Sequence, residues 1–105
     1  MKYYMCKNNK QLQKKLQVGD KVKIISSEKV NSIRKLGYDF MFGFNRTMLE
    51  YCGKEFVITY KKMRVERKYE DGTNPVLFFL KDAGDYNYCV EMFEEKPSTT
   101  MLKNE

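Results

Sequence analysis

The chain has 105 residues, and independent domains usually run from roughly 50 to 250 residues, so a single domain is expected. Hydrophobic residues make up 42% of it, yet no stretch approaches the roughly 18 apolar residues of a membrane span, and the early polar residues predict no signal peptide. The three cysteines are an odd number without Cys-x-x-Cys spacing. We therefore expect a globular domain of the cytoplasm with reduced thiols and no zinc site.

Charge is distributed unevenly along the chain. The formal net charge is +6, but residues 1–38 hold ten Lys and Arg against two acids, whereas residues 70–105 hold three against eight. Such asymmetry indicates a charged partner, either nucleic acid or an acidic protein face. The alternative is that the lysines only keep a small domain soluble.

The first element expected in chain order is a short amphipathic helix over residues 8–17, where Leu12 and Leu16 lie four positions apart. Residues 21–25 then alternate charged and apolar side chains, as a half-buried strand does. No long regular element is expected over residues 26–50, apart from a short helical turn that leads to Gly53, a residue that tolerates positive φ.

Aromatic residues recur at every second position within that stretch, namely Tyr38, Phe40, Phe42 and Phe44. A period of two places all four rings on one side of an extended segment. The segment is therefore predicted to be an ordered arm folded onto the domain. Its rings either contribute to a partner-binding surface or cap the open end of the core.

Two further strands are predicted over residues 55–60 and 76–80, as antiparallel neighbours joined by a hairpin at Asp71-Gly72. A bulge or bend is expected near Lys61 and Lys62, because the apolar positions change parity there.

The five residues 76–80 are all apolar, so both faces of this strand should be covered, by the helix over 8–17, by the aromatic arm or by a partner. A fourth strand over 86–90 and a 3₁₀ turn over 91–93 complete the domain. Residues 95–105 are predicted to be a flexible tail.

Basic residues gather on the predicted hairpin arm over residues 61–68; they are Lys61, Lys62, Arg64, Arg67 and Lys68. Such an arm could follow a phosphate backbone, with affinity gained by counterion release. It could also insert into the nucleic-acid groove of a host nuclease. A third interpretation is that the charges protect an edge strand from aggregation.

Residues suited to catalysis are scarce. The chain has no histidine, which removes the commonest general base and metal ligand. The acids Asp82, Asp85, Glu91, Glu94 and Glu95 are interpreted as solvated charges, and Cys52 and Cys89 as buried, inert thiols. We therefore predict no enzymatic activity, no cofactor, no metal and no small-molecule substrate.

Three segments carry a family resemblance: Val18-Gly19-Asp20-Lys21-Val22, Met48-Leu49-x-Tyr51-x-Gly53-Lys54 and Tyr86-x-Tyr88-x-x-Glu91-Met92-Phe93. Together they resemble small SH3-like barrel proteins of bacteriophages and mobile elements of low-GC Gram-positive bacteria, over about residues 18–94. The position of Tyr88 is often Trp in that family. The lysine-rich start and the long basic hairpin depart from its short members.

The resemblance implies a mainly β fold, a small open SH3-like barrel of four to five antiparallel strands with a short N-terminal helix. Residues 1–17 would be an N-terminal extension, 18–94 the barrel and 95–105 the tail. The chain has more apolar positions than a barrel interior of this size requires, which predicts a non-enzymatic protein-binding module of the bacterial cytoplasm. Its phage context brings in inhibitors of host defence, such as an anti-CRISPR protein that blocks a Cas nuclease. The alternative is a nucleic-acid-binding barrel that uses the basic hairpin.

Overall fold

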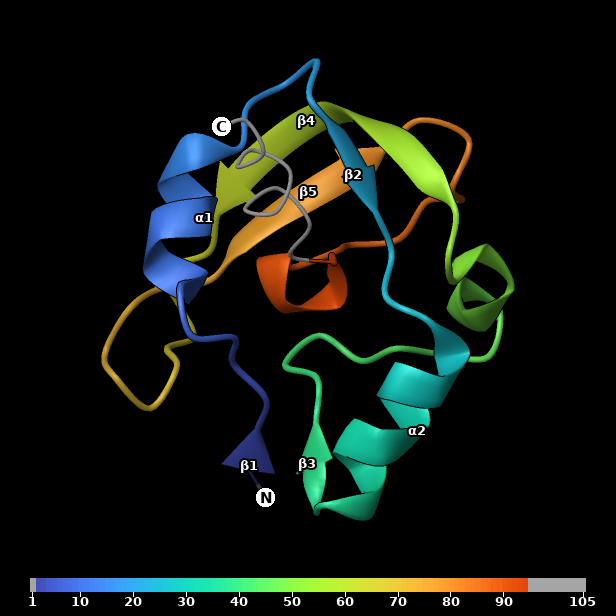
Figure 1. Ribbon diagram of the computed structural model, residues 1–105. Coiled ribbons are helices and arrows are strands. Elements are labelled where there is room, and N and C mark those ends of the chain that lie inside the picture. The colour runs from blue at the N-terminus through green and yellow to red at the C-terminus, as the bar shows by residue number, and fades with distance from the viewer. Residues whose placement is uncertain (1, 95–105) are drawn as a thin grey trace, which may run out of the picture.

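The computed structural model describes residues 2–94, and an antiparallel sheet of three strands lies at its centre. Its order is β2 (Lys21–Lys23), β4 (Glu55–Met63) and β5 (Val76–Leu80). Figure 1 shows β2 crossing in front of the other two strands. The alternating residues of β2 place Val22 in the core, and Ile24 just beyond it is fully buried. The prediction of these strands and of antiparallel pairing is confirmed.

One irregularity interrupts the pairing of β4 with β5. Ile58 pairs with Leu80 and Tyr60 with Phe79, so Thr59 has no opposite residue. An extra residue of this kind exchanges the faces to which later side chains point. The predicted bulge therefore exists, two residues before Lys61.

A second helix, α2 (Ser27–Lys35), occupies the region in which no long regular element was expected, and that expectation is wrong. The Ser26 hydroxyl caps the helix by accepting a hydrogen bond from the Lys29 amide at 3.1 Å. Val30 and Ile33, one turn apart, are buried in the core. The helix is followed by Gly37 at φ +93°, the left-handed conformation in which helices commonly end.

A parallel pair of short strands forms a separate ladder, in which β1 (Lys2–Tyr3) lies beside β3 (Tyr38–Asp39). This pair contradicts the expectation that all strands are antiparallel. In the part of the chain that the structure describes, strand and helix are present in similar shares, about 26% and 25%. The domain is therefore mixed α/β rather than mainly β.

The chain after β5 returns to the sheet through single residue pairs. Tyr88 bridges to Phe78, and Phe93 bridges to Ile24 beyond the end of β2. Between them lies the 3₁₀ helix η2 (Val90–Met92), one residue earlier than the predicted turn. The fourth strand predicted over 86–90 is thus reduced to one bridge. The open barrel itself stays a prediction.

Helix α1 (Asn9–Lys15) confirms the helix predicted from Leu12 and Leu16, and both leucines pack against the core. On β5, four side chains are buried and Phe79 is half-buried against the ring of Tyr60. The 3₁₀ helix η1 (Met48–Tyr51) and the positive φ of Gly53 also agree with prediction. Within residues 2–94, the helices are too short or too polar to cross a membrane. The predicted flexible tail, 95–105, lies outside the described residues.

Candidate binding surfaces

The aromatic arm contributes mostly to the core. Phe40 and Phe44 are each 2% exposed, and their rings meet edge to face at a centroid distance of 5.3 Å. Tyr38 is half-buried and its ring contacts that of Tyr4. A turn at residues 41–42 breaks the extended conformation, so the four rings do not share one side. Of the two interpretations of this arm, the structure favours capping of the core for Phe40 and Phe44.

Phe42 is the ring of this arm that meets the basic hairpin. The guanidinium groups of Arg64 and Arg67 lie 5.8 and 5.1 Å from its ring centroid, within the range of cation–π attraction. Arg67 also donates a hydrogen bond to the Met41 carbonyl at 2.8 Å, and Arg64 pairs with Glu66. The structure thus brings Phe42, Arg64 and Arg67 together, and these contacts attach the loop after β4 to the domain. The predicted arm over 61–68 is strand only as far as Met63.

The two lysines of β4 have different surroundings. The Lys61 ammonium donates to the carbonyl oxygens of Gln13 and Leu16, at 3.0 and 2.8 Å. These are carbonyls at the end of α1, which the helix itself leaves unpaired and which attract a positive charge. Lys62 and Lys68 are exposed. Of the predicted contact lysines, Lys61 is therefore occupied within the fold.

A groove of about 470 Å³ separates α1 from the end of β4 and from the loop before β5. Its lining residues are Lys10, Gln13, Lys14, Lys61, Lys62, Met63, Thr73, Asn74 and Val76. Met63 is 56% exposed and supplies an apolar surface inside a lysine-rich rim. In Figure 1 the loop of residues 64–75 lies beside the lower end of α1. We refer to this feature as the basic groove.

The polar groups of the basic groove are mainly hydrogen-bond donors. Lys10, Lys14 and Lys62 bring exposed ammonium groups. Gln13 is 7% exposed, and its amide nitrogen Nε2 has no hydrogen-bond partner among the described residues. An unpaired buried donor is costly, so it favours an acceptor. Donors and positive charge together complement carboxylate or phosphate oxygens.

A buried carboxylate forms a second polar feature, in the interior. Glu91 of η2 is 2% exposed, and its Oε1 accepts a hydrogen bond from the Tyr69 hydroxyl at 2.8 Å. Burial raises the pKa of Glu91 to about 7, against which the bond from Tyr69 acts. Burial and the nearby Glu91 also raise the pKa of Tyr69 far above its ordinary value. The interpretation of Glu91 as a solvated charge is therefore wrong.

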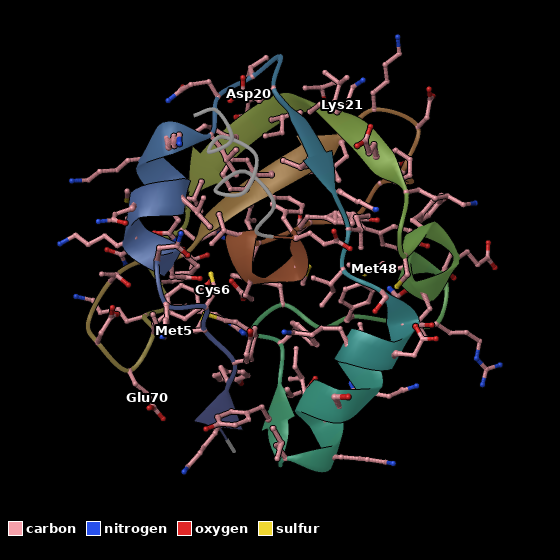
Figure 2. The ribbon with its side chains drawn as sticks, in the orientation of Figure 1. Met5, Cys6, Asp20, Lys21, Met48 and Glu70 are labelled. Carbon is pink, nitrogen blue, oxygen red and sulfur yellow. The ribbon has the colours of Figure 1, made fainter. Side chains whose placement is uncertain are left out.

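A smaller cavity, about 270 Å³, lies against this carboxylate. The residues that line it are Tyr4, Cys6, Ile25, Ser26, Lys29, Glu91, Phe93 and Glu94. They come from the N-terminal segment, from the start of α2 and from η2. Figure 2 labels Cys6 on the segment that leads from β1 into α1. We refer to this feature as the Glu91 cavity.

Burial affects two of the thiols in the described part of the chain. Cys89 is fully buried, and desolvation raises its pKa well above the ordinary value. Desolvation likewise raises the pKa of Cys52, with Glu28 adding to the effect. Residues 2–94 contain no group of three or more Cys, Asp or Glu placed to hold a metal ion.

Comparison of the chain with family models, with curated proteins and with solved structures finds no match.

Sequence reasoning did not find the basic groove or the buried acid, although each had a signal. Asn9 and Gln13 lie one turn apart and next to Leu12 and Leu16, so one face of the helix contains both amides and both leucines. Asn9 and Gln13 are buried on that face. Glu91 stands inside the apolar run 89–93, which predicts burial for an acid as well.

Proposed function

We propose that this chain is a non-enzymatic protein-binding module that holds an acidic segment of a protein partner in the basic groove. The observation that carries the proposal is the coincidence of exposed lysines, the unpaired Gln13 amide and the exposed Met63 in one groove. The volume of about 470 Å³ falls in the ordinary range of ligand sites, roughly 300–1,000 Å³.

The apolar part of the groove favours a protein segment over nucleic acid. Proteins that bind single strands commonly stack bases on exposed aromatic rings. The lining of the basic groove contains no aromatic side chain, and the ring of Phe42 nearby is engaged by Arg64 and Arg67. Met63 instead suits an aliphatic side chain between acidic ones.

The finer description rests on the family resemblance. In this description the chain is an SH3-like barrel of phage or mobile-element type in the cytoplasm of a bacterial host. There it inhibits a defence system, as anti-CRISPR proteins inhibit Cas nucleases. A basic groove does not complement the basic nucleic-acid channel of a nuclease. The contact on such a nuclease would therefore be an acidic face of the protein.

Charge reversal in the groove tests the proposal. A tagged triple variant, Lys10→Glu with Lys14→Glu and Lys62→Glu, is compared with wild type in pull-downs from bacterial lysate at moderate salt. Binding to a fluorescent acidic peptide that contains leucine is measured in parallel by polarisation. We expect at least a tenfold loss of peptide affinity and loss of the stoichiometric partner, because attraction becomes repulsion.

The matched control is Lys35→Glu with Lys54→Glu and Lys81→Glu, which makes the same change in net charge at exposed positions outside the groove. Equal loss in both triple variants would contradict a localised site. Mobility shifts with single- and double-stranded DNA and RNA at two salt concentrations test the rival function. Salt-sensitive binding that the groove variant abolishes, without any protein partner, would replace this proposal with a nucleic-acid-binding one.

A further inference from the structure

The carboxyl group of Glu91 lines the Glu91 cavity, and one of its oxygens accepts no hydrogen bond. Oε1 of Glu91 is held by the Tyr69 hydroxyl, while Oε2 is buried and has no hydrogen-bond partner among residues 2–94. A buried acceptor without a donor loses its hydration without compensation, which costs roughly 1–3 kcal/mol or more for a charged group. Because Glu91 lines the cavity, a donor bound there would satisfy this oxygen.

The other walls of the cavity set the shape of that donor. Ile25 and Phe93 supply apolar surface and Tyr4 an aromatic ring, while Ser26, Lys29 and Glu94 supply polar groups. The volume of about 270 Å³ is below the ordinary range for drug-sized ligands, but above the roughly 150 Å³ of a cavity that takes benzene. A short aliphatic chain with a polar end fits these dimensions.

We propose that the Glu91 cavity binds a primary ammonium group, from a small amine or from a lysine side chain of a partner, with its nitrogen donating to Oε2 of Glu91. The aliphatic stem then lies along Ile25 and Phe93. This site is separate from the basic groove, whose lining shares no residue with it.

The single available oxygen selects ammonium over guanidinium. Guanidinium groups bind carboxylates best through two parallel hydrogen bonds, which require both oxygens. Tyr69 already occupies one of them. An ammonium group is a compact point charge with rotatable donors, so one oxygen is enough for it.

The charges around the cavity have opposing effects on a bound cation. Glu94 adds a second acid, which attracts it but already pairs with the Lys23 ammonium at 3.9 Å, and Lys29 adds a positive charge, which repels it. Burial raises the pKa of Glu91 to about 7, so part of the Glu91 population is protonated near neutral pH and loses its proton when the ammonium binds. The titratable groups that surround this carboxyl are Tyr69 and Cys89 in the interior, and Tyr4, Cys6, Lys29 and Glu94 around the cavity.

The test uses the full chain and n-butylammonium chloride, with NaCl at matched ionic strength as reference. NMR titration at pH 7 should show saturable shifts of the Ile25 and Phe93 resonances with a dissociation constant in the millimolar range. The ¹³C shift of the Glu91 carboxyl, followed against pH, should show a pKa lowered by at least one unit at saturation. This shift corresponds to at least tenfold tighter binding of the ammonium by the ionised acid than by the protonated acid.

Matched variants and ligands make the result specific. Glu91→Gln keeps an oxygen for the Tyr69 hydroxyl and should weaken binding at least tenfold, whereas Lys29→Met should strengthen it two- to threefold. The neutral analogue 1-butanol should leave the Glu91 pKa unchanged. Circular dichroism confirms that each variant is folded.

Equal binding by wild type and Glu91→Gln, or an unchanged Glu91 pKa at saturating butylammonium, would overturn the inference. Nα-acetyl-lysine methylamide distinguishes the two sources of the group: binding identifies a lysine anchor, and exclusion while butylammonium binds identifies a small-amine site. Because the basic groove variants leave this cavity intact, failure here and failure of the proposed function are separable.

Discussion

Single polar residues in the interior decide much of the chemistry of this domain. The Tyr69 hydroxyl satisfies one oxygen of Glu91, and the Tyr88 hydroxyl donates to the Ala83 carbonyl at 3.0 Å. Burial raises the pKa of Tyr88 as well, so both tyrosines remain neutral donors at physiological pH. Glu91 is different, because its pKa falls within the physiological range.

Stability should therefore depend on pH through Glu91. Its pKa is about 7 when folded, against an ordinary value of 4.5, so between these values the folded chain binds more protons than the unfolded chain. The free energy of unfolding should fall as pH rises through this window, by roughly 3 kcal/mol, and then level off. Urea denaturation at pH 5 and pH 8 measures the difference. Glu91→Gln should remove it, and persistence in that variant would contradict the assignment.

Among the elements, α1 depends most visibly on a tertiary contact. It has only seven residues, and isolated helices of this length are marginal in water. The Lys61 ammonium supplies hydrogen bonds to the carbonyls of Gln13 and Leu16 from the neighbouring strand. Helix α2, by contrast, has its own cap at Ser26 and its own stop at Gly37.

Adjacent lysines of β4 provide a matched comparison for this dependence. Lys61→Met should destabilise the domain by about 1–3 kcal/mol, because it leaves two partly buried carbonyls without a donor. Lys62→Met, at an exposed position, should change stability by less than about 0.5 kcal/mol. Urea denaturation gives both values, and hydrogen exchange of the α1 amides should accelerate in the first variant alone. Similar values for the two variants would refute the role of Lys61.

At the scale of the whole molecule, the C-terminal part of the described chain connects residues 23–25 with strand β5. The Ile25 amide donates to the Met92 carbonyl, and the Glu94 amide donates to the Lys23 carbonyl at 2.7 Å. The ring of Phe93 packs edge to face on that of Phe78. Removal of this contact should affect every element at once.

Phe93→Ala should therefore cost about 3–5 kcal/mol, which is typical of a buried phenylalanine. The control is Phe79→Ala, since Phe79 is half-buried on the same strand as Phe78 and should cost clearly less. Thermal unfolding followed by far- and near-ultraviolet circular dichroism should show one shared transition in both variants. A cost for Phe93→Ala no larger than that of Phe79→Ala would contradict this role of Phe93.

The sequence by itself determined the elements whose signals are local. Alternation over residues 21–25, the apolar run 76–80, the leucine pair of α1 and the glycine at 53 each specify conformation within a few neighbours. Ser26 and Gly37 are local signals of the same kind, because they mark the beginning and the end of α2.

Only the tertiary structure decided which side chains meet. Three features join segments separated by 20 residues or more. They are the parallel pairing of β1 with β3, the cation–π contacts of Arg64 and Arg67 with Phe42, and the basic groove. Burial of Glu91 likewise depends on Tyr69, which lies 22 positions away. Such contacts arise from the packing of whole elements, and no periodicity within a single segment encodes them.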